Sequence, residues 1–261
     1  MTTAWDPAQY ERYKTYRDRP ALDLMVQIPS DRDYREIWDL GCGTGEHAAL
    51  LKRRHPEATV HGLDSSPDML ARCRERPEAI DWVEGRVEDW APATPPDLIF
   101  TNAALQWSED HAALFPRLMQ TLAPGGVLAC QMPVSFSAPQ HTVLRDLAAE
   151  PPWADRLANL RGVRPVAESR DYYGWLAPLS ADVDIWTTTY LHALTGDDPV
   201  VDWMLGTGLR PYVEALTSDA DRTLFLDAYR ARLRPVFPRQ PDGKTTLLPF
   251  PRLFLLARRR A

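Results

Sequence analysis

Short apolar segments alternate with helical patterns over residues 36–133 of this 261-residue chain, and the alternation restricts the folds that the chain can adopt. Parallel strands joined by helical crossovers are covered on both faces of their sheet, so their strands are short and almost wholly apolar. The pattern therefore predicts an α/β fold with a mostly parallel sheet and helices on both faces. The expected strands are EIWDL (36–40), TVHGLD (59–64), IDWVEG (80–85), DLIFTN (97–102) and GGVLACQMP (125–133).

Two of the intervening helices carry clear end signals. The helix EHAALLKRRHP is expected to stop before Pro56, since the residue before a proline disfavours helical geometry. SPDMLARCRER begins with Ser66 as the N-cap and Pro67 at the first helical position.

After Pro133 the alternation lapses and helical patterns dominate. One further strand is expected at 183–192, and TTLLPF and RLFLLARR at the end of the chain suggest a hairpin-type strand pair. Ligands of open α/β sheets bind outside the carboxyl ends of the strands, so two helical insertions there would form a cap. We therefore predict a single domain over 1–261 with an N-terminal helical lid (1–30), a cofactor-binding core (30–133) and helical cap insertions (134–178 and 195–240).

Composition narrows the class of function. A formal net charge of −6 argues against a surface that coats nucleic acid. The chain has no apolar run of membrane-spanning length, and its first 20 residues lack the pattern of a signal peptide, so we expect a cytoplasmic protein with no membrane partner. Isolated Cys42, Cys73 and Cys130 suggest neither a disulfide framework nor a metal cluster, and the histidines lack metal-ligand spacing. No metal is expected.

The segment DLGCGTG (39–45) carries the strongest local signal. Its glycines form either a tight turn or a loop that a cofactor approaches closely. In a dinucleotide fingerprint the third glycine would fall at position 46, where this chain has Glu46, and a carboxylate at a helix N-terminus repels a pyrophosphate. Asp64 follows at the end of the second strand, where a carboxylate can accept both hydroxyls of a ribose. A ligand with a ribose and no phosphate fits these charges.

The segments DLGCGTG and GLDSSPDML together resemble the class I S-adenosylmethionine-dependent methyltransferases. This resemblance implies a Rossmann-like fold with a seven-stranded sheet, and S-adenosylmethionine as the cofactor, with S-adenosylhomocysteine as its product. It implies that Asp39 binds the amino-acid end of the cofactor, Asp64 the ribose, and Met69 the adenine. Arg86 stands where the family often has an acidic residue for the adenine, so Glu88, Asp89 or the backbone near Val87 would take that role. The expected cofactor-binding residues are Asp39, Gly41, Cys42, Gly43, Asp64, Ser65, Met69, Val87, Glu88 and Asn102.

Outside the cofactor half the chain contains the segments WDPAQY, RDRP, NAALQW, DIWTTTYLH, TGLRPY and PFPRLFLLARR. These segments resemble the trans-aconitate methyltransferase branch of that family nearly from end to end. The resemblance implies transfer of the methyl group to a carboxylate of trans-aconitate, giving the monomethyl ester.

A carboxylate acceptor makes specific chemical demands. It is already an anion at neutral pH, so no general base and no catalytic residue of that kind is expected. Arginines suit the other carboxylates of a small polycarboxylate because the planar guanidinium binds a carboxylate in a bidentate way, although each arginine is also compatible with a surface ion pair. The tyrosines 10, 13 and 16 form a helical stripe that either packs on the sheet or closes over the ligand. The expected substrate-binding residues are Tyr10, Arg17, Arg19, Trp107, Tyr172, Arg210 and Arg252.

Two other functions stay open at this point. A methyltransferase acting on a hydroxyl or carbon of another small molecule would need a base such as His192 or Glu109. A binding module that senses the cofactor without catalysis would give the two helical insertions no obvious use.

Overall fold

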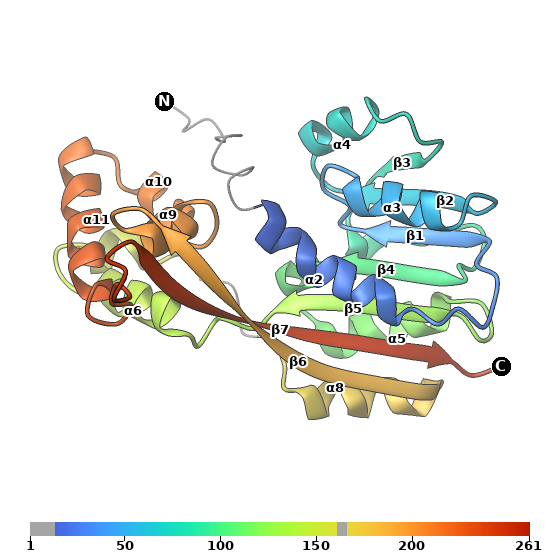
Figure 1. Ribbon diagram of the computed structural model, residues 1–261. Helices are drawn as coiled ribbons and strands as arrows, with labels where there is room; N and C mark the ends of the chain where they lie inside the picture. Colours follow the sequence, from blue (N-terminus) through green and yellow to red (C-terminus); the bar gives the residue numbers. More distant parts are fainter. Residues whose placement is uncertain (1–13, 161–165) are drawn as a thin grey trace. The chain divides into compact units, whose positions relative to one another are not determined.

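The computed structural model describes residues 14–160 and 166–261 (Figure 1). The chain divides into two compact units. The sheet unit comprises residues 18–133, 166–188 and 252–261, and the described part of the helical unit comprises residues 14–17, 134–160 and 189–251. The single seven-stranded sheet has the order β3-β2-β1-β4-β5-β7-β6.

Five parallel strands form the first part of the sheet, as the sequence predicts. They are β1 (Glu36–Leu40), β2 (Thr59–Asp64), β3 (Asp81–Glu84), β4 (Leu98–Asn102) and β5 (Val127–Pro133). The chain runs outward from β1 to β3 and then returns to place β4 on the other side of β1. Such a reversal of strand order opens a crevice at the carboxyl ends of the two central strands. In this protein those ends are Leu40 and Asn102.

The end of the chain differs from the prediction. A terminal hairpin is wrong, because residues 245–259 form the single strand β7 (Thr245–Arg259). Its prolines, Pro249 and Pro251, precede the stretch that pairs with β5, where Arg252 to Arg258 run antiparallel to Pro133 to Val127. A proline has no N–H to donate and is tolerated outside such a ladder. The strand β6 (Ser180–Thr195) is also longer than the expected 183–192.

Helices cover both faces of the sheet (Figure 1), which confirms the predicted α/β architecture. On one face lie α2 (Lys14–Gln27) and α3 (Glu46–Arg54), whose His47 ring contacts Phe100 of β4. The helices α5 (His111–Thr121) and α8 (Ser169–Leu176) pack against each other through Phe115 and Tyr172. The remaining elements of this unit are α4 (Pro67–Cys73) and the short turns η1 (Val87–Asp89), η2 (Leu105–Trp107) and η3 (Ala177–Leu179).

The helix ends follow the local signals. The Ser66 side chain accepts a hydrogen bond from the Met69 N–H, and Pro67 is the first residue of α4, as predicted. Helix α3 ends at Arg54, two residues before Pro56. The start of α4 lies beside the glycine loop, because Asp64 accepts hydrogen bonds from both Gly43 and Ser66.

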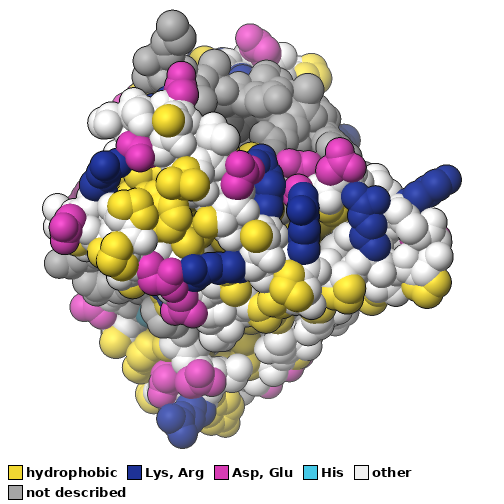
Figure 2. Space-filling view, turned by 90° about the vertical axis from the view of Figure 1, so that its left-hand side faces the viewer, with side chains coloured by type: hydrophobic (Ala, Val, Ile, Leu, Met, Phe, Trp, Pro, Cys, Tyr) yellow, Lys and Arg dark blue, Asp and Glu magenta, His cyan; other side chains and the backbone are white. Residues whose placement is uncertain are grey.

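The helical unit has a hydrophobic core of its own. It is built from α6 (Pro139–Ala148), α7 (Ala154–Leu157), α9 (Pro199–Leu205), α10 (Arg210–Ala215) and α11 (Asp219–Leu233). Trp203, Phe225 and Tyr229 are the largest fully buried side chains of this core. Figure 2 shows one face of the molecule, on which acidic and basic side chains are interspersed around a hydrophobic patch. Helix α8, which falls within the predicted cap range 134–178, lies in the sheet unit.

Candidate active site

Backbone hydrogen bonds tie the glycine loop to the end of β2. The N–H groups of Gly41 and Cys42 both donate to the Leu63 carbonyl, at 2.8 and 2.9 Å. The Asp64 carboxylate accepts from the Gly43 N–H at 2.8 Å and from the Ser66 N–H at 2.9 Å. Each carboxylate oxygen keeps a further lone pair. Asp64 thus joins the glycine loop to the start of α4 and can still accept hydrogen bonds from a ligand.

The first two glycines of the loop have different roles. Gly41 has φ +74°, and a Cβ added there would lie 2.2 Å from the Cβ of Ala104. Gly43 has φ +56°, and an added Cβ would meet no atom within 4 Å. Gly41 therefore serves packing between the loop and the residues after β4, whereas Gly43 leaves space that a ligand can occupy.

Asp39 is a buried carboxylate at the end of β1, with only 1% of its surface exposed. The pKa of Asp39 is raised from 3.8 to about 7: burial is the main cause, the hydrogen bond from the Ala48 backbone lowers it, and the nearby charge of Asp64 adds a smaller rise. Among the described residues, Oδ2 has no hydrogen-bond partner. A buried acceptor of this kind is costly unless a donor satisfies it. A cationic donor on a ligand would do so.

Further buried polar atoms lie at the carboxyl ends of β4 and β5. Asn102 and Gln131 are adjacent in the strand register. Within the described part of the chain, the Asn102 Oδ1, the Gln106 Oε1 and both amide atoms of Gln131 lack hydrogen-bond partners. The sequence analysis included Asn102 but missed Gln106 and Gln131. A lone glutamine inside the apolar strand VLACQMP was the signal for Gln131.

The backbone is strained beside these residues. Ala103 has φ +53° and is the one non-glycine residue of the described ranges with a positive φ. Its N–H donates to the Gln131 carbonyl at 2.9 Å, and its carbonyl accepts from the Gln106 Nε2 at 2.6 Å. Strained residues of this kind cluster at ligand sites, where neighbouring contacts hold them in place.

The turn after β3 is held from the opposite side by α5. Arg117 donates to the carbonyls of Val87 and Trp90, at 2.6 and 2.7 Å. Arg86 lies 3.4 Å from the exposed carboxylate of Glu88. Ser65 is exposed and Met69 half-buried at the start of α4. The strands β2 and β3 are adjacent and parallel. Ser65 and Met69 follow the end of β2, and Val87 and Glu88 follow the end of β3.

Three of the predicted substrate-binding residues lie in the sheet unit beyond the glycine loop. Trp107 ends η2 and is 64% exposed. Arg252 is 5% exposed and pairs in register with Pro133. Tyr172 is fully buried, with its hydroxyl 2.6 Å from Nδ1 of His111, so it packs between α5 and α8 and we do not carry it into the proposed site.

The other predicted substrate-binding residues are dispersed. Arg19 is exposed on α2 in the sheet unit, with its Nε 3.8 Å from Asp23. Arg210 forms an ion pair with Glu214 at 2.7 Å in the helical unit. Arg17 lies in α2, and Tyr10 and Tyr13 lie outside the described residues. Arg19 and Arg210 therefore belong to different compact units, and each has an acidic side chain of its own helix beside it.

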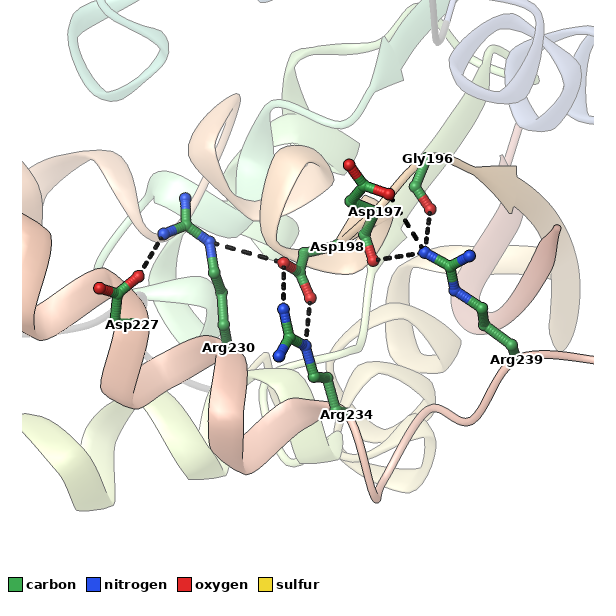
Figure 3. Close-up of polar contacts among 7 residues, drawn as sticks. All are labelled: Gly196, Asp197, Asp198, Asp227, Arg230, Arg234 and Arg239. Carbon is green, nitrogen blue, oxygen red and sulfur yellow. Dashed lines mark hydrogen bonds and ion pairs between the residues drawn. The ribbon is translucent and has the colours of Figure 1, made fainter. Parts of the chain in front are cut away.

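A hollow of about 1070 Å³ lies within the helical unit, and its arginines are already neutralised. Arg234 binds Asp198 in a bidentate way at 2.9 and 3.0 Å, and Arg230 lies 2.8 Å from Asp227 (Figure 3). Arg239 donates to the carbonyls of Gly196 and Asp197. These groups form a structural ion-pair network, and no residue of the glycine loop lines the hollow.

Neither a metal-binding cluster nor a membrane-spanning helix occurs in the described part of the chain. Among residues 14–160 and 166–261, no group of three His, Cys, Asp or Glu side chains is placed to hold a metal ion. The described helices also include none with the length and apolarity that a membrane span requires.

Comparison with known proteins identifies the family. A methyltransferase domain model matches residues 37–126, which include the glycine loop and β4. The chain is 47% identical over 256 residues to the trans-aconitate 2-methyltransferase of Methylobacterium nodulans, covering 98% of each chain. It is 44% identical over 253 residues to the enzyme of the same name from an Azoarcus species, covering 97% of this chain and 98% of the relative. The chain belongs to the trans-aconitate 2-methyltransferase family.

Solved structures agree with this at the level of the fold. The YcgJ protein of Bacillus subtilis superposes with a TM-score of 0.58 at 14% identity, over 93% of this chain and 99% of that one. A phosphoethanolamine N-methyltransferase of Haemonchus contortus gives 0.54 at 15% identity, over 93% of this chain and 53% of that one. These likenesses confirm the Rossmann-like class I methyltransferase fold. The family membership makes the protein a methyltransferase.

The two glycines give the first prediction. Alanine at either position adopts a left-handed conformation at a cost of about 1–2 kcal/mol. Gly41→Ala also forces a clash with Ala104, which costs a further ~1–3 kcal/mol. Urea unfolding of the two variants without ligand should therefore show the larger loss of stability for Gly41→Ala. Equal losses would mean that the glycine loop does not pack on Ala104 as described.

Asp39 gives the second prediction. Since the folded-state pKa is raised from 3.8 to about 7, the folded protein holds a proton that the unfolded chain has released between those values. The contribution of Asp39 to the free energy of unfolding is therefore fully present below the lower pKa and lost as pH rises towards the upper one, by up to about 1.4 kcal/mol per pH unit. Asp39→Asn should remove this dependence in urea unfolding without ligand.

The exposed Asp182 supplies the control for this measurement. Asp182→Asn should leave the pH dependence of the free energy of unfolding unchanged from about pH 4 to about pH 7. If Asp39→Asn gives the same pH dependence as Asp182→Asn, Asp39 does not titrate in the way the buried site requires.

Proposed function

We propose that this protein transfers the methyl group of S-adenosylmethionine to a carboxylate of trans-aconitate, releasing the monomethyl ester and S-adenosylhomocysteine. The observation that carries the proposal is the 47% identity over nearly the full length to a trans-aconitate 2-methyltransferase. A match that extends so far beyond residues 37–126 includes the segments outside the methyltransferase domain model.

The residues at the ends of β1 and β2 fit the proposed cofactor. Its ammonium group supplies the cationic donor that the unpartnered Oδ2 of Asp39 requires. Its ribose hydroxyls suit the lone pairs that Asp64 retains after binding Gly43 and Ser66. The open space beside Gly43 admits a ligand close to the backbone. When bound, S-adenosylmethionine supplies an electrophilic methyl group on a sulfonium.

The turn after β3 is the proposed adenine contact. Arg86 is paired with Glu88, so the backbone near Val87 is better suited to the base than the Glu88 carboxylate. Arg117 fixes that backbone by binding the Val87 and Trp90 carbonyls. In this proposal Arg117 is a positioning residue, and Met69 and Ser65 border the same part of the site.

The acceptor needs no base from the protein. A carboxylate has a lone pair available for displacement at neutral pH, so the protein has to align it and exclude water. His192, a candidate base for other acceptors, is 2% exposed and lies among the rings of Tyr16, Trp203 and Phe250. Glu109, the other candidate, is exposed. These placements favour the carboxylate acceptor.

Several narrower predictions rest on the sequence alone. They are the roles of Arg17, Arg19, Arg210, Arg252, Trp107 and Tyr10 in binding the polycarboxylate, the role of Asn102 in binding the cofactor, the domain ranges and the cytoplasmic location.

The function is tested by the chemistry of the product. Purified protein incubated with methyl-labelled S-adenosylmethionine should label trans-aconitate, and mild alkali should release the label as methanol because the product is an ester. Saturated tricarboxylates and monocarboxylic acids serve as comparison acceptors. An alkali-stable product would point to a hydroxyl or carbon acceptor, and the absence of transfer to any of these acids would overturn the proposal.

Arg117 gives a further prediction. Arg117→Met removes two charged hydrogen bonds to the Val87 turn, each worth about 1.5–3 kcal/mol, and should weaken binding of S-adenosylmethionine by at least about tenfold. The Michaelis constant for the acceptor should change much less. Calorimetric titration of the folded variant measures the cofactor affinity.

Arg170→Met is the matched control, because Arg170 is 86% exposed and its ion pair is with the neighbouring Asp171. It should bind the cofactor like the wild type. If Arg117→Met and Arg170→Met have the same affinity, the turn after β3 does not contribute to cofactor binding.

A further inference from the structure

Two cysteines that are 31 positions apart in the sequence meet beneath the glycine loop. Cys42 lies within the loop and Cys73 is the last residue of α4. Both thiols point to the same acceptor, the Gly43 carbonyl, with the Cys73 Sγ at 3.1 Å and the Cys42 Sγ at 4.0 Å. The two residues form a small buried cluster with Leu70, against which Trp82 packs. The two cysteines are isolated in the sequence, and the fold brings them together.

The surroundings make the two thiols unequal. The hydrogen bond from the Cys42 thiol and the charge of Arg76 lower the pKa of Cys73, against its burial. The same hydrogen bond and burial raise the pKa of Cys42. Arg76 is fixed nearby because its Nε donates to the Thr44 carbonyl at 2.7 Å. Two neighbouring cysteines, one with a lowered and one with a raised pKa, are the arrangement found where one cysteine is oxidised and a second resolves it.

The third cysteine provides an internal comparison. Cys130 lies on β5, is fully buried, and burial raises the pKa of its thiol. Cys130 is buried like Cys42 and Cys73 but lies outside their cluster. It can therefore serve as a control for a buried thiol in the same protein.

We propose that Cys42 and Cys73 form a reversible disulfide when the protein meets a hydroperoxide, and that this bond reduces binding of the cofactor at the glycine loop. The effect on the cofactor rests on the proposed function, whereas formation of the bond does not. Both cysteines are free in this structure.

The reaction balances with the hydroperoxide as the oxidant. The Cys73 thiolate attacks one peroxide oxygen, the O–O bond breaks, and a sulfenic acid forms as hydroxide leaves and takes up the released proton. The Cys42 sulfur then attacks the Cys73 sulfur, the S–O bond breaks, and a second water leaves with the Cys42 proton. Two thiols are oxidised to one disulfide, and one hydrogen peroxide is reduced to two waters.

The bond would act on the glycine loop through Gly43. A disulfide brings the two sulfurs to about 2.05 Å, which draws Cys42 and the end of α4 together. It also removes the Cys73 S–H that donates to the Gly43 carbonyl. The N–H of Gly43 binds Asp64, the proposed ribose ligand, so displacement of Gly43 disturbs both sides of the cofactor site. Losing one hydrogen bond to this partly buried carbonyl corresponds to about a tenfold loss of affinity.

The experiment treats the full chain with hydrogen peroxide, removes the excess, and analyses it by peptide mass mapping and by calorimetric titration with S-adenosylmethionine. We expect a peptide that links Cys42 to Cys73 with the loss of two hydrogens, and about tenfold weaker binding that dithiothreitol restores. Absence of the linked peptide overturns the proposed bond. A linked protein that binds the cofactor with unchanged affinity overturns the proposed effect.

Two variants make the test specific. Cys73→Ser keeps a donor to the Gly43 carbonyl, so it should bind S-adenosylmethionine like the wild type and should lose its sensitivity to peroxide. Cys130→Ser, the matched control, should keep that sensitivity. The peptide mapping of the wild type tests the disulfide without either variant. Failure of the reduced wild type to bind S-adenosylmethionine would count against the proposed function, while the linked peptide would still report on the disulfide.

Discussion

The attachment of the glycine loop to the end of β2 is the interaction on which the candidate site depends. The Leu63 carbonyl accepts from two successive loop N–H groups, and the Asp64 carboxylate accepts from Gly43 and Ser66. These bonds set the direction in which the loop leaves β1, and hence the burial of Asp39 and the open space beside Gly43. Because parallel strands end at a common edge, one residue at the end of β2 can organise a loop that belongs to β1.

The polar groups of this site affect both the stability of the protein and its interactions with a ligand. Asp39 is buried at a cost, with an oxygen that no described residue satisfies. Buried polar atoms also lie unpaired at the ends of β4 and β5, beside the strained backbone of Ala103. Such features lower the stability of the protein without a ligand and strengthen the interactions that a matching ligand makes. Unpaired buried polar atoms and a strained backbone at one edge of the sheet are typical of a binding site.

The sequence predicted the parts that local pattern determines. Apolar spacing predicted the five parallel strands. Serine and proline signals predicted the start of α4 at Pro67 and the end of α3 before Pro56. The single strand β7 could not be predicted in this way, because Pro249 and Pro251 normally indicate an interruption between two strands. They are compatible with one strand because pairing with β5 begins only at Arg252. The meeting of Cys42 with Cys73 likewise depends on how α4 folds back beneath the glycine loop. Asp39 and Asp64 could be identified as candidate site residues from the sequence, because each lies near the end of a strand that the sequence predicts.

The strand order also affects how the chain is made. β7 is the last strand in the sequence, yet it lies between β5 and β6. During synthesis this edge of β5 therefore has no β7 to pair with until residues 252–258 have been made. An unpaired apolar edge is prone to join other chains. A variant without residues 252–258 would keep this edge of β5 unpaired and open to pairing with other chains.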